Sequence, residues 1–247
     1  MRPIQISCNS LSFFVIGNYL NDGHDFVIKS SSHNKNFDYF IFLDSRGVSS
    51  DFSTSLAQKI IHEMERKKSS YLIICRPIEL TTWSTLINFL SINQLSPTKI
   101  ITNMGFVDFT PKKLSLLDDA IKQARYLMGE KIVQPTFVEN FLSSTGDLIS
   151  LYSMDYSYEY KKNIEALTEK FEILLINTPL VDSLINFTRS RPSSFYDGLI
   201  NTNKFNRSIE NIKTIDLPDF DTKLTYDAVH YTSSGSDLIF DKIKEYL

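Results

Sequence analysis

Short, nearly continuous apolar runs recur along the chain from residue 37 to its end. They cover residues 39–43, 71–75, 99–102 and 172–177, and the more polar segment 213–217 is predicted as a fifth strand. Runs of this length without polar alternation are typical of strands that are buried on both faces of a parallel sheet. Each run therefore predicts one strand of a central sheet.

Between these runs, apolar residues recur every three or four positions, which is the spacing of one face of a helix. The first helix can be capped by Asp51 or Ser53, and the second can begin at Thr81 or Thr82. The other helices cover residues 112–127, 161–170, 203–211 and 234–246. Strands that alternate with helices predict an α/β fold, here a three-layer α/β/α sandwich with about five parallel strands.

The N-terminal residues follow a different pattern. Two apolar segments, 11–20 and 25–29, are separated by the turn signal Asn-Asp-Gly at 21–23. This pattern predicts a β-hairpin extension over residues 1–36.

The remaining chain, residues 37–247, is expected to form one α/β domain. Within it, residues 128–158 are less regular and rich in tyrosine and serine, so we expect an insertion or lid there. Residues 188–199 contain proline and glycine and are expected to form a loop.

The composition agrees with one domain and argues against several classes of protein. With 247 residues, the chain is long enough to bury a sizeable core. Its net charge of −3 argues against a general nucleic-acid binder, which is usually basic. Cys8 and Cys75 are too few for a disulfide framework or a zinc cluster, and both are expected to be small core residues.

No stretch reaches the roughly 18 apolar residues that a membrane-spanning helix needs. The apolar run at 11–16 is followed at once by polar residues and makes a poor signal peptide. We therefore expect no membrane span and a cytoplasmic location.

The strongest chemical pattern is Asp227 followed by His230, in the loop between the fifth predicted strand and the last helix. Imidazole can take and return a proton near neutral pH. A carboxylate three residues earlier on a tight loop can fix the tautomer and orientation of the ring. The alternative is a helix-entry loop in which Ser233 or Ser234 caps the helix and His230 is merely packed.

Two further loops follow predicted strands at the carboxyl edge of the sheet, where ligands bind in folds of this kind. Ser45 follows the first strand, near a helix N-terminus whose amides can stabilise an oxyanion, or it simply caps the turn. In residues 103–108, Asn103 can donate to an oxyanion and Gly105 permits a ligand to approach closely. Equally, Asn103 can satisfy a turn and Asp108 can cap the next segment.

Other catalytic and cofactor-binding patterns are absent from the sequence. No Gly-x-Ser-x-Gly elbow, glycine-rich phosphate loop or dinucleotide fingerprint occurs. His24, His33 and His62 lack partners at metal-ligand spacing and are expected at the surface. We therefore predict neither a metal site nor a cofactor.

Together, these segments resemble the SGNH (GDSL-type) hydrolase superfamily over residues 37–247, in the expected order. In that family, Gly-Asp-Ser follows the first strand, Gly-x-Asn-Asp follows the third, and Asp-x-x-His precedes the last helix. Residues 43–45, 105–108 and 227–230 match these three blocks. The resemblance implies a flavodoxin-like sheet and esterase or acyl-transfer chemistry.

By this resemblance, Ser45 would attack an acyl ester and His230 would act as general base and then as general acid. Asp227 would orient His230. The amide of Ser45 would hold the oxyanion. A backbone amide near Leu80 would supply a further oxyanion donor, and either Asn103 or Gly105 would supply another.

The departures from the family pattern concern the oxyanion side of the site. Leu43 stands where glycine is usual, and residues 77–80, in the second block, contain no glycine. Val107 stands where the family has its oxyanion asparagine, and valine cannot donate a hydrogen bond. Asn103 or Arg76 would have to replace that donor.

The expected substrate is a small-molecule or carbohydrate ester, first of all a sugar or polysaccharide O-acetyl group, because many relatives act on such groups. Arg46, next to the proposed nucleophile, would attract an anionic substrate. One alternative is an O-acyltransferase of polysaccharide biosynthesis with the same triad. Another, favoured by the missing glycine and by Val107, is a catalytically degenerate SGNH-like protein that binds a glycan or protein without turnover.

Overall fold

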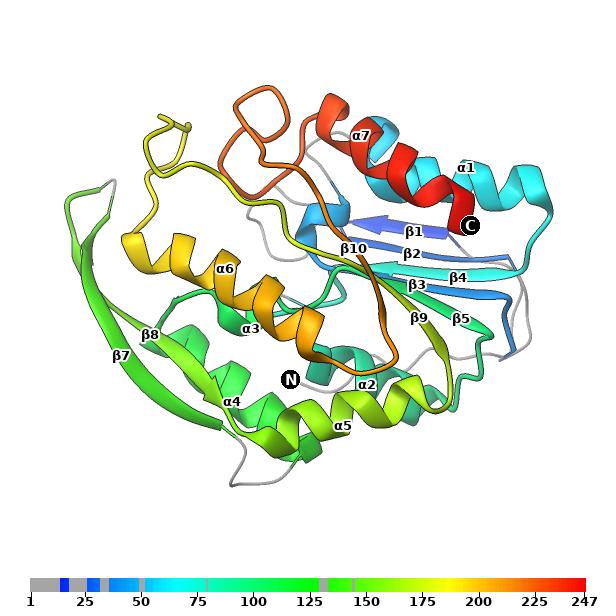
Figure 1. The fold of residues 1–247 in the computed structure, drawn as a ribbon, viewed down its shortest axis with the longest axis horizontal. Helices are drawn as coiled ribbons and strands as arrows, with labels where there is room; N and C mark the ends of the chain where they lie inside the picture. The colour runs from blue at the N-terminus through cyan, green and yellow to red at the C-terminus, as the bar shows by residue number, and fades with distance from the viewer. Residues whose placement is uncertain are drawn as a thin grey trace.

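The computed structural model describes most of the chain (Figure 1). The described residues are 14–17, 26–31, 36–48, 52–78, 80–128, 133–143 and 145–247. Several features of the sequence analysis lie outside these ranges, namely the turn at 21–23, Cys8, His24, His33 and Asp51.

A seven-stranded sheet crosses the molecule, and a block of neighbouring strands in it is parallel. These strands are β3 (Tyr39–Leu43), β4 (Tyr71–Cys75), β5 (Lys99–Thr102), β9 (Glu172–Ile176) and β10 (Lys213–Ile215). Their spatial order is β4-β3-β5-β9-β10, which is the order of flavodoxin-like sheets. The predicted α/β class with a parallel sheet is confirmed. The strand order reverses at β3, and such a reversal is where these sheets bind ligands.

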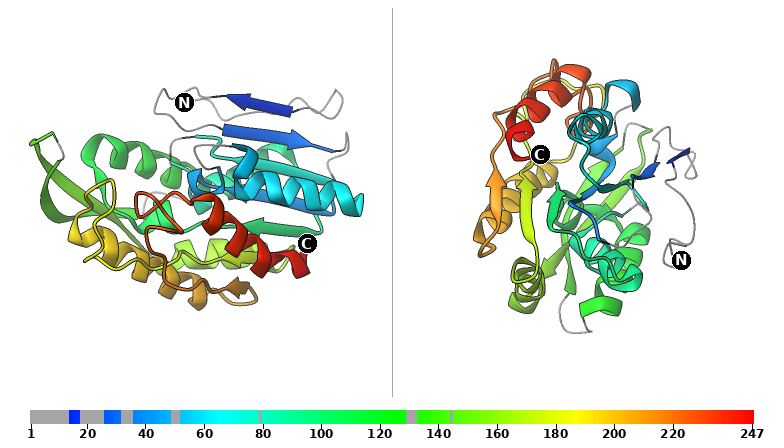
Figure 2. Two further views of the ribbon diagram at one scale, coloured as in Figure 1. Left: turned by 90° about the horizontal axis from the view of Figure 1, so that it is seen from above. Right: turned by 90° about the vertical axis from the view of Figure 1, so that its right-hand side faces the viewer.

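Two antiparallel strands extend this sheet beyond β4. β2 (Phe26–Ser30) pairs with β4, and β1 (Phe14–Gly17) pairs with β2. The N-terminal segment therefore continues the main sheet at its edge (Figure 2).

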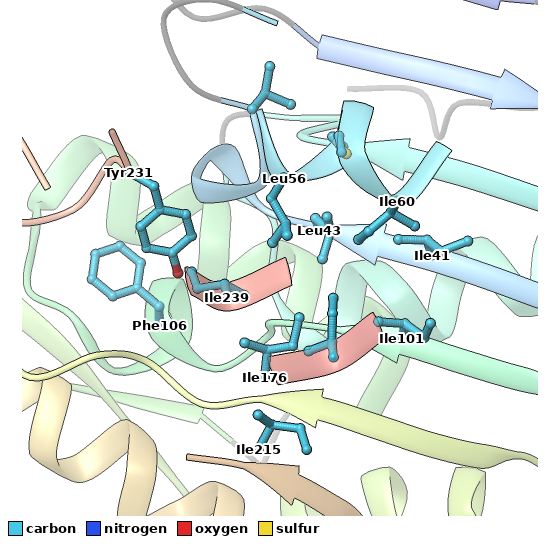
Figure 3. Packing of buried hydrophobic residues seen from close by; sticks show 14 of the residues in the cluster. Ile41, Leu43, Leu56, Ile60, Ile101, Phe106, Ile176, Ile215, Tyr231 and Ile239 are labelled. Carbon is cyan, nitrogen blue, oxygen red and sulfur yellow. The ribbon is translucent and has the colours of Figure 1, made fainter. Parts of the chain in front are cut away.

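Helices cover both faces of the sheet. One face carries α1 (Leu56–Lys67), α6 (Ser193–Ser208) and α7 (Ser233–Ile243), and the other carries α2 (Trp83–Asn93), α4 (Leu114–Met128) and α5 (Tyr158–Thr168). Side chains of β3 alternate between the two cores, with Ile41 and Leu43 in the first (Figure 3) and Phe40 and Phe42 in the second. The predicted three-layer sandwich is confirmed. In the described part of the chain, none of the helices is long and apolar enough to cross a membrane.

The starts of the first two helices follow from their capping residues. Ser55 caps α1, and its side chain accepts an amide of the first turn. The predicted cap at Ser53 is wrong, because Phe52–Thr54 forms a separate 3-10 turn. Thr82 caps α2 through a reciprocal capping box with Thr85, in agreement with the prediction.

Residues 188–199 are not a continuous loop, because α6 begins directly after Pro192. Proline is tolerated at this position, since the first helical amides have no partner within the helix. Gly198 lies inside α6 where this helix crosses α3 (Phe106–Phe109). A Cβ at position 198 would be 2.9 Å from the carbonyl oxygen of Phe109. Close helix packing, and not a turn, therefore requires this glycine.

Residues 128–158 are more regular than expected and form mainly an antiparallel ribbon. β7 (Val133–Leu142) pairs with β8 (Leu148–Tyr156), and β6 (Lys112–Lys113) joins the other edge of β8. The ribbon extends away from the main sheet, on the left of Figure 1. Its contacts with the N-terminal end of α6 connect it to the loops at the carboxyl edge of the main sheet.

Candidate active site

Ser45 lies directly after β3, at the carboxyl edge of the sheet. It is half-buried and opens a short 3-10 turn that leads the chain away from the strand. Asp44 caps this turn by accepting the Arg46 amide at 2.9 Å. A Cβ at Gly47 would be 2.6 Å from the Cβ of Leu43, so the turn requires glycine there. The turn places Ser45 where the strand order reverses.

The fold brings His230 to Ser45 across a separation of 185 residues. The Nε2 of His230 lies 3.2 Å from the Oγ of Ser45, and its Nδ1 lies 3.0 Å from the Oδ2 of Asp227. Both distances are within hydrogen-bond reach. Ser45, His230 and Asp227 thus form one continuous chain of hydrogen-bonding groups.

A tight loop, here called the histidine loop, carries Asp227 and His230 and holds them together. The Oδ1 of Asp227 accepts the amides of Val229 at 3.0 Å and His230 at 2.8 Å, which leaves Oδ2 to face the imidazole. Ala228, between them, has a left-handed φ of +67°. The Tyr226 ring stacks on the imidazole with 5.8 Å between centroids. His230 is therefore oriented by its own loop and is more than a packing residue at a helix entry.

The Asp227 carboxylate is enclosed by donors. Burial raises its pKa, but the hydrogen bonds and charge of His230, together with the charge of Arg191, outweigh burial and hold the pKa of Asp227 well below its usual range. Arg191 lies 36 residues before Asp227, and nothing in the local sequence signals this contact. Sequence reasoning therefore missed Arg191, because only the fold brings the two residues together.

Arg46 is buried, so the prediction that it attracts an anionic substrate is wrong. The side chains of Arg46 and Asp44 are each 1% exposed and form an ion pair. The Nε of Arg46 donates to both Asp44 carboxylate oxygens, and Nη1 donates to the Thr178 hydroxyl at 2.7 Å. Although burial opposes the charge, the Asp44 carboxylate raises the pKa of Arg46 above its ordinary value. A cation paired in this way is not available to a ligand.

Asn103 makes hydrogen bonds to the same buried ion pair. Its Oδ1 accepts the Asp44 amide at 2.9 Å, and its Nδ2 donates to the Asp44 carboxylate at 3.0 Å. Arg46 in turn donates to the carbonyl oxygen of Asn103. The Asn103 side chain is committed to Asp44, which contradicts its expected role as an oxyanion donor.

Gly105 and Asp108 are also explained by packing. Gly105 precedes α3 with a φ of +106°, and a Cβ there would be 2.8 Å from the Oδ1 of Asn206 in α6. Asp108 is fully buried and accepts hydrogen bonds from the Tyr160 hydroxyl and, at 3.4 Å, from the Trp83 amide. Asp108 therefore accepts the first amide of α2, the helix that Thr82 caps, and does not cap the segment that follows it.

The remaining oxyanion candidates, Arg76 and Leu80, lie after β4, and Val107 lies in α3. Arg76 is buried and has a φ of +50°, a left-handed conformation that glycine adopts more readily. Its amide donates to the Leu43 carbonyl oxygen at 2.8 Å and so continues the pairing of β4 with β3. Leu80 is buried in the core under α2, and Val107 is partly buried between the two cores. Arg76 thus supplies the backbone conformation that the absent glycine of the second block would favour.

A pocket of about 480 Å³ opens next to the histidine loop, between the segments after β9 and β10 and the helix α6. Its walls are mostly apolar, and three exposed carboxylates belong to it: Asp182, Asp219 and Asp221. Among the described residues, no lysine or arginine lines it. Phe220 in its wall packs on Tyr231, with 5.7 Å between ring centroids. The pocket therefore adjoins the histidine loop, while Ser45, Asp227 and His230 themselves do not line it.

The start of α7 holds the histidine loop through Gly235. Thr232, and not Ser233 or Ser234, caps this helix by accepting the Gly235 amide at 3.1 Å. A Cβ at position 235 would be 2.1 Å from the carbonyl oxygen of Leu224, which itself accepts the Thr232 amide. The loop that carries Asp227 and His230 is therefore closed by a contact that only glycine permits.

Gly235→Ala is expected to destabilise the protein by about 1–3 kcal/mol, because an added methyl group forces this fixed backbone contact apart. Asp227 and His230 lie between the two ends of the contact, so the same shift is expected to slow any reaction of Ser45. Thermal unfolding followed by circular dichroism measures the loss of stability. Ser234→Ala, an exposed neighbour in the same helical turn, is the control. Equal unfolding temperatures for the two variants would contradict this expectation.

A scan against models of protein families finds no match, and a search of curated proteins finds none either. Solved structures do match. The chain is similar to a protein from Parabacteroides merdae described as a GDSL-like lipase, with 12% identity and a TM-score of 0.41. That similarity covers 86% of this chain and 96% of the other.

The chain is also similar to two carbohydrate esterases. One is a family two carbohydrate esterase from Clostridium thermocellum in complex with cellohexaose, with 11% identity, a TM-score of 0.42 and coverage of 87% of this chain and 65% of that chain. The other is an acetyl xylan esterase from Butyrivibrio proteoclasticus, with 12% identity and a TM-score of 0.38. That similarity covers 85% of this chain and 63% of the other. This chain therefore spans slightly less than two thirds of either esterase. Likeness at this level carries over neither an activity nor a substrate.

Proposed function

We propose that this protein is a divergent SGNH-type serine esterase that removes an acyl group, first of all an O-acetyl group, from a carbohydrate or small-molecule ester. The observation that carries the proposal is the chain of hydrogen-bonding groups from Ser45 through His230 to Asp227, at 3.2 Å and 3.0 Å. A histidine that only packs needs neither a hydroxyl at one ring nitrogen nor a carboxylate at the other. A serine hydroxyl, by contrast, is a weak nucleophile until a positioned base takes its proton.

In the proposed reaction, the Nε2 of His230 takes the hydroxyl proton as the Oγ of Ser45 attacks the carbonyl carbon of the ester. Asp227 holds the Nδ1 proton and stabilises the imidazolium that forms. When the tetrahedral intermediate collapses, His230 gives its proton to the leaving alcohol and Ser45 is acylated. A water molecule, deprotonated by His230, then attacks the acyl group, which leaves as the acid and restores Ser45.

The oxyanion of the intermediate needs hydrogen-bond donors near Ser45. Within the described part of the chain, the Ser45 amide makes no hydrogen bond, so it supplies one donor in this proposal. Asn103 is held by Asp44, and Val107 cannot donate. Because one missing donor typically costs about 100- to 1000-fold in rate, we propose a slow esterase.

The pocket next to the histidine loop favours an uncharged substrate over an anionic one. Its carboxylates, from Asp182, Asp219 and Asp221, repel anions, and Arg46 is not available to attract them. Sugar hydroxyl groups can donate to these carboxylates, while the face of a sugar ring can pack on Tyr196 in the pocket wall. An uncharged acetylated sugar is therefore the substrate that we propose.

A second candidate is a protein that binds the same ligand without turnover. Val107, at the position of the family's oxyanion asparagine, favours this candidate, as does the commitment of Asn103 to Asp44. An O-acyltransferase would use the same Ser45, His230 and Asp227, and would differ in the acceptor of the acyl group.

Incubation with a fluorophosphonate probe and with p-nitrophenyl acetate tests the proposal. We expect covalent labelling at Ser45, located by peptide mass spectrometry, and release of p-nitrophenol. Acceptor sugars added to the same reaction distinguish the two activities, because transfer yields an acetylated sugar and hydrolysis yields acetate. Folded protein that is neither labelled nor active would overturn the esterase and leave the binding protein as the remaining candidate.

A further inference from the structure

Arg191 donates hydrogen bonds to both the backbone and the side chain of Asp227. Its Nε and Nη2 donate to the backbone carbonyl oxygen of Asp227 at 3.1 Å and 3.0 Å. Nη2 also donates to the Oδ2 of Asp227 at 3.0 Å, and this is the oxygen that faces the Nδ1 of His230. One guanidinium therefore fixes both the backbone of the acid and the oxygen through which it contacts the base.

The Arg191 side chain is itself enclosed. It is 12% exposed, and its guanidinium lies over the Phe195 ring, 5.0 Å from the centroid. Burial lowers the pKa of Arg191 to about 10, against the opposing effect of Asp227, so the group stays charged at neutral pH. Arg189, two residues earlier, is exposed and offers a matched comparison.

The β7–β8 ribbon holds the segment that carries Arg191. Glu139 of β7 accepts hydrogen bonds from the hydroxyls of Ser193 at 2.6 Å and Ser194 at 2.9 Å, at the N-terminal end of α6. A carboxylate at a helix N-terminus is stabilised by the helix dipole. Only Pro192, whose φ is restricted by its ring, separates these serines from Arg191. The ribbon is thus connected to Asp227 through a short, stiff segment.

We propose that Arg191 is a positioning residue of the active site, which fixes Asp227 toward His230 and is itself held in place by Glu139 of the β7–β8 ribbon. The inference rests on the proposed function and deepens it, because it assigns a role to the ribbon. Arg191 acts through geometry. Its forked donors fix the backbone carbonyl oxygen and the Oδ2 of Asp227.

Two variants test this role. Arg191→Lys keeps the positive charge but loses the fork, since lysine has a single nitrogen. We expect it to slow fluorophosphonate labelling about 10-fold or more. Arg191→Met removes every donor to Asp227, and we expect it to slow labelling about 100-fold.

The measurement is the rate constant of fluorophosphonate labelling at neutral pH. Arg189→Met is the matched control and is expected to be labelled at the rate of wild type. Circular dichroism shows whether each variant is folded. If Arg191→Met is labelled as fast as wild type, Arg191 does not position Asp227 and the inference is overturned.

A second measurement does not depend on activity. The Nδ1 proton of His230, hydrogen-bonded to Asp227, is expected as a low-field proton NMR signal that His230→Gln lacks. Arg191→Met is expected to broaden or abolish this signal, and Arg189→Met to keep it. A signal unchanged in Arg191→Met would overturn the inference even if wild type reacts with no probe, whereas absent labelling with an Arg191-dependent signal would overturn only the proposed function.

The ribbon's part in the inference has its own variant. Glu139→Ala leaves Asp227, His230 and Arg191 unsubstituted and removes the acceptor of the two serine hydroxyls. We expect it to reproduce the NMR effect of Arg191→Met in part, with a smaller loss of labelling rate. A Glu139→Ala protein identical to wild type in both measurements would overturn the role of the ribbon.

Discussion

Replacement of Ser45 by alanine is expected to lower kcat for p-nitrophenyl acetate by as much as about 10⁶-fold. The reason is that the proposed covalent pathway needs the hydroxyl as its nucleophile. His230→Ala is expected to cost about as much, because the hydroxyl stays unreactive without a base. The double variant is expected to be no slower than either single variant, since the two groups act as one unit.

Steady-state kinetics and fluorophosphonate labelling measure these losses together. Asp227→Asn is expected to lose about 10⁴-fold, because an amide favours the wrong tautomer of the imidazole. Ser234→Ala, an exposed serine in α7, is the control and is expected to keep full activity. Undiminished hydrolysis and labelling in Ser45→Ala would assign the reaction to another residue and refute the proposed nucleophile.

Arg46→Met is expected to destabilise the protein by about 3–5 kcal/mol, which is the usual cost of removing one partner of a buried ion pair. Asp44 would lose its ion-pair partner at a site that is 1% exposed, and Thr178 would lose the donor at its hydroxyl. For a domain of this length, such a loss lowers Tm by on the order of 10 °C. Thermal unfolding followed by circular dichroism measures the change.

Arg207→Met is the matched control, because Arg207 pairs with Asp216 at the surface, where the two side chains are 52% and 58% exposed. Removing an exposed pair is expected to cost about 1 kcal/mol or less. The double variant Asp44→Asn/Arg46→Met is expected to be more stable than Arg46→Met alone, since no buried charge remains unpaired. If Arg46→Met and Arg207→Met unfold at the same temperature, the buried ion pair does not stabilise this turn.

The parallel strands were predictable because their signal is local. A strand buried on both faces excludes polar side chains along its whole length. The limits predicted from the sequence, residues 39–43 and 71–75, are therefore the limits of β3 and β4 in the structure. The start of α6 was not predictable in the same way. Gly198 has the composition of a loop but is explained by the backbone of α3, which lies against it in space.

The same distinction between local signals and long-range contacts applies to the proposed site. Asp227 and His230 are three residues apart on one tight loop, so their pairing depends on local geometry that a sequence pattern can express. The approach of Ser45 could be anticipated only because the carboxyl ends of parallel strands share one edge of the sheet. The oxyanion side was the least predictable, because Asn103 and Arg46 have polar side chains that could face either a ligand or each other.

The sequence by itself determined the α/β class, the strands of the parallel sheet, and the Asp227–His230 loop with Ser45 at the same edge, because apolar runs and short spacings act over a few residues. Only the tertiary structure decided the partners of the charged groups. Arg46 was expected to face a ligand but is buried against Asp44, and Arg191, unremarked in the sequence, contacts Asp227. The physical reason is that a charged side chain is stabilised by the neighbours that the fold brings to it, and those neighbours come from distant parts of the chain.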